Sequence, residues 1–465
     1  MNRQGFLAAA LAACCVVPGH SPRANEPPGI IPGEFVDSET MLETGGDLGS
    51  PALDFQEEQD TILVSPDAAS YQFYITDLES RFGPYATELS EQLLGLGRVY
   101  QEQNLHSQAI DIFKRAVHIV RINGGLYAPE QIPLLQREIR SLMAVGDFES
   151  ADERQFYLYR VQANVYGLQS EQMSLAMLER AEWEREAYYL SVGETSFLRL
   201  LTMWELYSNV LRNIARQEGK LSEGLLRPLQ GLLQTQYLIS SYAPGSPAGF
   251  QSGGPDEHSA EQARFGMVRV SNYKQGQAVI TAMREVYGYN EGEGSPLPAE
   301  ALIKLGDWHL WHQKRESALA AYQQAWDELS ALEDGERLLE EHFSQPVLLP
   351  DVPGAHQDLT EPEIVRGYAN VSYDITAKGR VKNLVLENTE ASGSVALAAA
   401  DDEQAGAVEE EPGDAADGET TAAASENDSE TPVQLMRRVK RLLYRPRFEN
   451  REPVAVEDVR RRYAY

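Results

Sequence analysis

The sequence predicts a mainly α-helical chain that ends in a small α+β module. Between residues 70 and 345, apolar side chains recur every three or four positions, which is the period of an amphipathic helix. Within this region one spacing of small and aromatic residues occurs twice, which indicates repeated helical hairpins. Residues 368–376 instead alternate between apolar and polar side chains, as in a half-buried β-strand. We therefore expect a helical solenoid over 70–345 and an α+β module over 346–390 and 431–465.

The chain of 465 residues is strongly acidic, with 71 Asp and Glu against 40 Lys and Arg and a formal net charge of −31. Because nucleic-acid binding requires a basic surface, this balance excludes a general nucleic-acid binder. No catalytic motif stands out. The glycines at 95 and 97 lack the third glycine and the preceding strand of a dinucleotide site. We predict a protein that is not an enzyme and uses no cofactor.

Residues 1–24 have the pattern of a bacterial export signal. Arg3 is followed by an apolar run over 6–17, which is too short for a membrane span of ~20 residues. The only two cysteines, Cys14 and Cys15, lie here, so the exported body has no disulfide. Two alternatives stay open: cleavage near Ala24 removes both thiols, or residues 11–14 form a lipoprotein box and Cys14 is lipidated. Both predict an exported chain, and the second adds a lipid anchor as the one membrane contact.

Two stretches hold much of the negative charge. Residues 25–69 contain eleven Asp and Glu and no Lys or Arg, and residues 401–430 contain twelve and again none. Such stretches bury too little apolar surface to fold. We expect a disordered linker over 25–69 and a disordered insert over 391–430 within the α+β module.

The repeated spacing joins a glycine, an alanine, an aromatic residue and a second alanine, which are 12, 4 and 3 positions apart. These residues are Gly97, Ala109, Phe113 and Ala116 in the first copy and Gly306, Ala318, Tyr322 and Ala325 in the second. Small residues let two helices approach to ~8–10 Å, and the aromatic ring fills the groove between them. With Leu96 and Tyr100, the first copy resembles the tetratricopeptide repeat. The resemblance implies a solenoid whose surface binds proteins or peptides.

A weaker copy of the repeat is predicted at Gly146 and Ala151, whose separation of five equals that from Asn104 to Ala109. Further long helices are expected over 200–214 and 225–238. Residues 244–257 are rich in Gly, Pro and Ser and predict a loop.

The α+β module is predicted from a strand over 368–376, a glycine turn over 377–380, a return strand over 381–386, a basic helix over 433–444 and a last strand over 454–463. This order, with residues 373–375, 379–381, 444–446 and 450–454 as matching motifs, resembles the C-terminal domain of the TonB family. In that family the domain pairs edge to edge with a short strand of an outer-membrane receptor. The resemblance implies a docking site at the last strand and at the corner 445–448. Its expected contact residues are Arg445, Arg447, Phe448, Val454, Val456 and Val459.

Two functional hypotheses follow. The first is a non-enzymatic scaffold that binds envelope proteins or peptides in the periplasm of a Gram-negative bacterium, which is the compartment that the TonB-family resemblance implies. The second is an auxiliary component of a TonB-type transport system, beside a true transducer, because the chain lacks that family's N-terminal membrane helix.

Other charged and metal-type residues have simpler explanations. His309 and His312 lie one turn apart, but no acidic or Cys partner is fixed, so we expect packing and not a metal site. Glu182, Glu184 and Glu186 are interpreted as a solvated helix face. The basic residues of the tail either bind an anionic partner or are neutralised by the acidic insert. They are Arg437, Arg438, Lys440, Arg441, Arg445, Arg447, Arg451, Arg460, Arg461 and Arg462.

Overall fold

A computed structural model describes residues 66–193, 196–242, 259–352, 367–391 and 432–465. The predicted export signal with Cys14, most of the acidic linker, the loop over 244–257 and nearly all of the acidic insert lie outside these residues. The mainly α-helical fold class with a small α+β module is confirmed. The first helix begins at Pro66, four positions before the predicted start of the solenoid.

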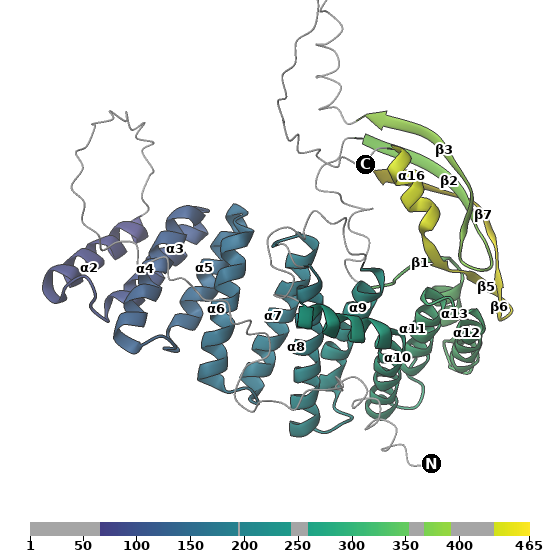
Figure 1. Cartoon of the computed structure of the whole chain (residues 1–465), viewed down its shortest axis with the longest axis horizontal. Helices are drawn as coiled ribbons and strands as arrows, with labels where there is room; N and C mark the ends of the chain where they lie inside the picture. Colours follow the sequence, from purple (N-terminus) through teal and green to yellow (C-terminus); the bar gives the residue numbers. More distant parts are fainter. Residues whose placement is uncertain (1–65, 194–195, 243–258, 353–366, 392–431) are drawn as a thin grey trace, which may run out of the picture. The chain divides into compact units, whose positions relative to one another are not determined.

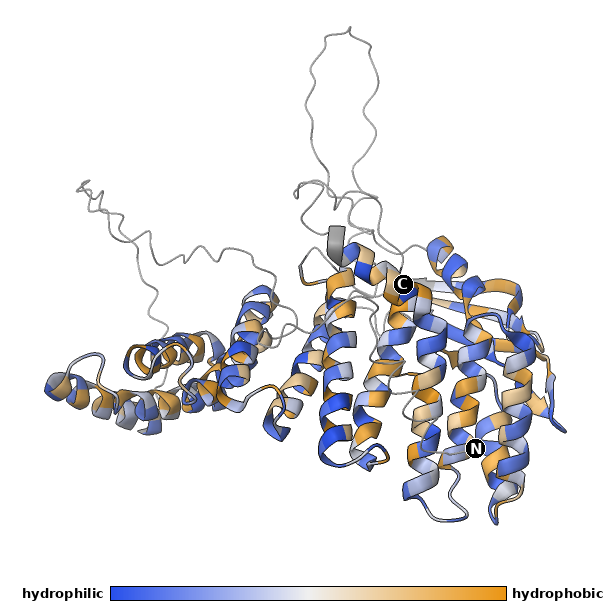
Figure 2. Ribbon diagram, turned by 60° about the horizontal axis from the view of Figure 1, so that its bottom comes forward, coloured by the Kyte–Doolittle hydropathy of each residue, from blue (hydrophilic) through white to orange (hydrophobic). Residues whose placement is uncertain are grey.

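The described helices pack against the next helix within two runs, from α2 to α8 and from α11 to α13 (Figure 1). They are α2 (Pro66–Phe82), α3 (Leu89–Glu102), α4 (His106–Gly124), α5 (Gln131–Val145), α6 (Phe148–Tyr166), α7 (Glu171–Tyr189), α8 (Ser196–Gln217), α9 (Leu226–Ser241), α10 (Ser259–Asn290), α11 (Leu297–Trp311), α12 (Arg315–Ser330), α13 (Gly335–Phe343) and α16 (Pro432–Arg441). Hydrophobic and hydrophilic residues alternate around these helices, as amphipathic packing requires (Figure 2).

The described residues form two compact units. One contains the helices up to residue 220 together with 238–271, and the other contains 221–237 and everything from Asn272 onward. The helices α11 to α13 and the α+β module therefore belong to one unit. No described helix is both long and apolar enough to cross a membrane.

The helical hairpins α3–α4 and α11–α12 are closed by the same contact. A Cβ atom added at Gly97 would overlap the ring of Phe113, and one added at Gly306 would overlap the ring of Tyr322. Both rings are almost fully buried, and the alanines beside them are at most 2% exposed. The glycines are therefore needed for the close approach of the two helices in each hairpin.

The turns inside three hairpins also share a backbone conformation. Asn104, Gly146 and Gln313 have positive φ angles of 60°, 78° and 61°, and each stands five positions before a buried alanine. The third hairpin, α5–α6, thus repeats the geometry of the other two at Gly146 and Ala151. The left-handed residue ends the first helix of each pair and lets the chain reverse.

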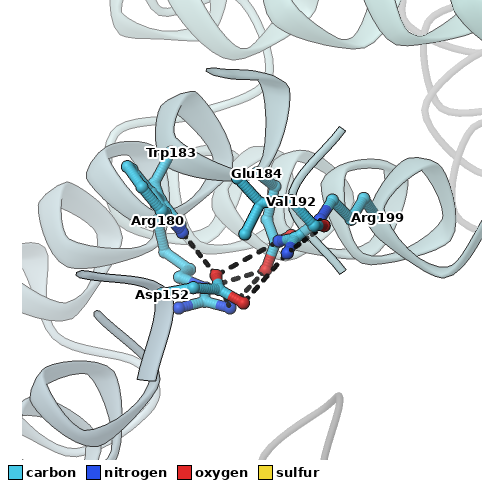
Figure 3. Close-up of polar contacts among 6 residues, drawn as sticks. All are labelled: Asp152, Arg180, Trp183, Glu184, Val192 and Arg199. Atoms are coloured by element: carbon cyan, nitrogen blue, oxygen red, sulfur yellow. Dashed lines mark hydrogen bonds and ion pairs between the residues drawn. The ribbon is translucent and has the colours of Figure 1, made fainter. Parts of the chain in front are cut away.

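A buried ion-pair network joins α6, α7 and α8 (Figure 3). Arg199 Nη2 donates to Asp152 Oδ2 at 2.9 Å and its Nη1 donates to Glu184 Oε2 at 2.9 Å. Arg180 Nε donates to Glu184 Oε1 at 2.9 Å, and Trp183 Nε1 donates to Asp152 Oδ1 at 2.6 Å. Burial alone would raise the pKa of Asp152, but the hydrogen bonds from Arg199 and Trp183 outweigh it and lower that pKa.

This network corrects the interpretation of Glu184 as part of a solvated face. Glu184 is 3% exposed and both of its carboxylate oxygens accept from arginines. Arg180 lies one turn before Glu184 on α7, but Arg199 comes from α8, so the pattern along α7 alone did not indicate the burial of Glu184.

The α+β module contains three small antiparallel sheets. Its strands are β1 (Val347–Leu349), β2 (Gly367–Ile375), β3 (Val381–Ala391), β4 (Leu443–Arg445), β5 (Arg447–Glu449), β6 (Glu452–Val454) and β7 (Val456–Ala464). The main sheet has the order β3-β2-β7, while β1 pairs with β4 and β5 pairs with β6. In Figure 1, α16 lies against the main sheet.

Three predicted boundaries in the module are wrong. The basic helix ends at Arg441, because residues 443–445 form β4 and pair with β1, a short strand that was not predicted. The return strand runs to Ala391, five residues beyond its predicted end. Val454 is not part of the last strand, since it pairs with Arg447 in a separate hairpin, and β7 begins at Val456.

Candidate partner-binding edge

One face of the main sheet packs against α16 in a hydrophobic core. Val371, Tyr373 and Ile375 alternate along β2 and are at most 1% exposed, and they share a hydrophobic cluster with Leu435 and Val439 of α16. One face of the sheet is therefore covered by α16, as the alternation in the sequence predicts.

Hydrogen bonds among three tyrosine hydroxyls connect β4 and β7 to β2. The hydroxyl of Tyr373 lies 2.7 Å from that of Tyr444 and 3.1 Å from that of Tyr463. Burial raises the pKa of Tyr444 and of Tyr463, so both remain neutral hydroxyls that hydrogen-bond inside the core. This contact links β2 to its sheet neighbour β7 and to β4, which belongs to the separate β1–β4 sheet.

The turn between β2 and β3 touches the same region. Gly379 has a φ of 73°, and a Cβ there would overlap the carbonyl oxygen of Tyr444. The Tyr444 amide donates to the Gly379 carbonyl at 2.8 Å. Glycine is required here both for its backbone conformation and for the close approach.

The strand β7 is an edge strand whose outer side pairs with no described strand. Gly367 and Tyr465 exchange both backbone hydrogen bonds, at 3.1 and 3.0 Å. Because bonded and non-bonded pairs alternate in an antiparallel ladder, Tyr463 and Arg461 also point their backbone groups toward β2. The N–H and C=O groups of Arg460, Arg462 and Ala464 therefore point away from the sheet.

The pairing register of β7 with β2 is more regular than that of β3, the strand at the opposite edge of the sheet. Residues 459–464 keep one uninterrupted register against β2, which is a run of about 20 Å at 3.3 Å per residue. Against β3 the register shifts twice, between Asn370 and Val371 and between Ser372 and Asp374. Bulges of this kind protect an edge against strand addition. Among the described strands, β7 is thus the better template for an added strand.

Arg445 does not lie on this edge, which corrects the prediction that it contacts a partner. It is 4% exposed, and its guanidinium lies 3.5 Å from Asp307 Oδ1 and 3.4 Å from Asp351 Oδ2. Tyr322 also donates to Asp307 Oδ1 at 2.8 Å. Burial raises the pKa of Asp307 although Arg445 opposes that shift. Arg445 joins the module to α11 and is not available to another molecule.

Phe448 requires the same correction. It is 4% exposed, and its ring centroid lies 5.3 Å from that of Tyr322 and 5.0 Å from that of Phe343. Arg451 adds an ion pair to Asp327 at 2.8 Å. The corner 445–448 is therefore the attachment of the module to the last helical hairpin. The sequence did not indicate this because the repeat aromatic and the corner are far apart along the chain.

The remaining predicted contact residues lie near the surface. Arg447 is 40% exposed and pairs with Glu449. Val456 and Val459 belong to β7 and are half-buried, and Val459 packs against the cluster under α16. Val454 lies outside the edge, in β6.

His309 of α11 and His312, the residue directly after this helix, take part in packing. Tyr273 OH lies 3.0 Å from His309 Nδ1, and the ring of His312 contacts that of Trp308 at a centroid distance of 4.4 Å and a tilt of 59°. Burial lowers the pKa of His312 to about 4. Within the described part of the chain, no group of three His, Cys, Asp or Glu side chains is arranged to hold a metal ion.

Comparison with known proteins identifies no family. No family model matches the chain, and no curated protein matches it. Among solved structures, BtubC (BKLC) from P. vanneervenii is 13% identical with a TM-score of 0.31, and the match covers 57% of this chain and 90% of that one. A putative kinesin light chain with nearly identical TPR-like repeats from Podosopora anserina is 11% identical with a TM-score of 0.34, covering 53% and 97%. These similarities are too weak to carry an inference about partners.

Proposed function

We propose that this protein is a non-enzymatic interaction scaffold of the Gram-negative cell envelope, and that β7 binds an extended peptide segment of a partner by strand addition. The position of β7 at the edge of the main sheet, with one register over 459–464, is the observation that carries this proposal. An added strand would form backbone hydrogen bonds with Arg460 and Ala464, which supply affinity with little sequence requirement. The resemblance of the module to the TonB C-terminal domain supports the same mode of binding.

The periplasmic location rests on the export pattern of residues 1–24. Processing that is blocked by globomycin would assign the lipid anchor to Cys14, whereas insensitive processing would assign a simple signal cut.

The edge is tested by removing one backbone donor. Arg460→Pro deletes an N–H that points away from β2, so the pairing of β7 with β2 is kept. Arg460→Ala removes the same side chain and keeps the N–H. We expect a strand-forming peptide captured by the wild-type chain to bind Arg460→Ala but not Arg460→Pro. Equal binding to both variants would contradict strand addition at this edge.

The alternative function, an auxiliary component of a TonB-type transport system, predicts a particular set of partners. The full chain should then capture outer-membrane receptors or motor proteins from envelope extract, and Arg460→Pro should not. The full chain is needed because a cut at residue 346 would expose Phe448 and leave Arg445 without Asp307. Capture of neither class would count against the transport role.

A further inference from the structure

The basic residues at the end of the chain divide into those that have a described partner and those that have none. Five arginines form an ion pair or lie over an aromatic ring, namely Arg445, Arg447, Arg451, Arg460 and Arg462. On α16, Arg437, Lys440 and Arg441 form no ion pair with any described residue. The positive charge of these three side chains is therefore not compensated within the part of the chain that the structure describes.

Arg437, Lys440 and Arg441 form one stripe on the side of α16 that points away from the main sheet. Because successive residues of a helix are turned by ~100°, these three lie within an arc of ~100°. All three are exposed, whereas Leu435 and Val439, on the opposite side of the helix, are fully buried in the cluster that contains β2. We call these three residues the α16 stripe.

The α16 stripe belongs to a basic module within an acidic chain. Residues 367–391 and 432–465 contain thirteen Lys and Arg against seven Asp and Glu, a net charge of +6. Arg380 pairs with Leu443, two positions after Arg441, so its backbone lies close to the end of the stripe. Arg380 likewise forms no ion pair with a described residue. A ligand of this surface should therefore be an anion.

The chain itself supplies a segment of opposite charge beside the stripe. Residues 401–430 contain twelve Asp and Glu and no Lys or Arg, and they end two positions before Pro432, where α16 begins. The stripe lies ~8–14 Å along the helix from Pro432, at 1.5 Å per residue. An unstructured chain of 6 to 18 residues, which separate Glu426 and Asp414 from Pro432, spans ~13–24 Å. These carboxylates are therefore within reach of the stripe.

We infer that residues 401–430 dock on the α16 stripe through their carboxylates and screen it from other anionic molecules. Tethering holds these carboxylates at a local concentration of ~mM, so another anion must compete with them for the stripe. The stripe lies on the side of α16 that faces away from the main sheet. The inference therefore does not depend on the strand addition proposed for β7.

Carbodiimide cross-linking of the full chain tests the docking, because this reagent joins a lysine amine to a carboxylate that touches it. Lys440 is the lysine of the stripe. Lys382 is the matched control, because it is exposed and stands opposite Asp374, on the sheet face away from α16. We expect Lys440 to cross-link to residues 401–430 about fivefold more than Lys382 does, as two or three surface ion pairs would give.

Salt separates docking from chance encounters in this experiment. In 0.5 M salt, where the Debye length is ~4 Å, the excess at Lys440 should disappear. Equal cross-linking of Lys440 and Lys382 at low salt would overturn the inference, and so would an excess that 0.5 M salt leaves unchanged.

A binding experiment tests the screening, with a labelled ten-residue glutamate peptide as the probe. Replacing the twelve Asp and Glu of 401–430 by Asn and Gln should make the full chain bind this peptide about tenfold more tightly at low salt. The same replacement of the eleven Asp and Glu of 25–69 changes the net charge almost equally and should leave the affinity within about twofold. Arg437→Gln, Lys440→Gln and Arg441→Gln, added together to the first variant, should remove its gain.

Three outcomes of the binding experiment would overturn the inference. The first is that the wild-type chain binds the glutamate peptide as tightly as the variant neutralised over 401–430. The second is an equal gain in the two neutralised variants, which would show an effect of net charge alone. The third is binding of the wild-type chain to phosphatidylglycerol vesicles that the three glutamine substitutions abolish, which would show that a lipid surface occupies the stripe.

Discussion

Replacing Gly306 by alanine tests the contact that closes the helical hairpins. Two effects oppose each other at this position. Alanine favours a helix by about 0.5–1 kcal/mol over glycine. The new methyl group, however, would overlap the ring of Tyr322, which is 2% exposed and cannot move into solvent. Overpacking of this kind costs about 1–3 kcal/mol, so we expect a net loss of about 1–2 kcal/mol.

Gly288 provides the matched control in α10. It is exposed, and a Cβ there would have no atom within 4 Å. Gly288→Ala should therefore stabilise the protein by about 0.5 kcal/mol. Urea unfolding followed by circular dichroism gives the free energies, and hydrogen exchange over 297–330 shows whether α11 and α12 open first. If Gly306→Ala stabilised the chain as Gly288→Ala does, the close helix approach would be refuted.

Three further perturbations have defined outcomes. Arg199→Met removes one arginine partner from both Glu184 and Asp152, so we expect the free energy of unfolding in urea to fall by about 3–5 kcal/mol. The control Arg81→Ala breaks an exposed ion pair and should lower it by less than about 1 kcal/mol. Phe448→Ala should cost about 3–5 kcal/mol and expose the attachment of the module to proteolysis; unchanged stability and resistance would refute the attachment. Because folding lowers the pKa of His312 from 6.5 to about 4, the unfolded chain takes up a proton that the folded chain rejects. The contribution of His312 to the free energy of unfolding is therefore fully present above pH 6.5 and is lost as the pH falls toward 4. His312→Gln should therefore show a smaller fall in Tm between pH 7 and pH 4.5 than the wild type, and parallel curves would contradict this.

The sequence predicted the parts of the fold whose pattern lies within one hairpin. The spacing of Gly97 and Phe113 reflects a contact between neighbouring helices, and the alternation along 371–375 reflects the burial of one face of the sheet. Contacts between distant segments were not visible. The strands β1 and β4 have three residues each, which is too short for a period to show.

The candidate site was predicted in part for the same reason. The last strand was expected from its own residues, and β7 does lie at a sheet edge. The burial of Arg445 depends on Asp307, which belongs to a helix far earlier in the chain. The difference between Arg460 and Arg461 depends on the register against β2, which only the structure supplies.

Strand addition at β7 is the central claim, and backbone amide hydrogen exchange measured residue by residue tests it most directly. On addition of a captured strand-forming peptide, the amides of Arg460 and Ala464 should become protected, because they point away from β2. The amide of Arg461, which already faces β2, should change little. Protection confined to the helices, with no change at Arg460 and Ala464, would contradict the account.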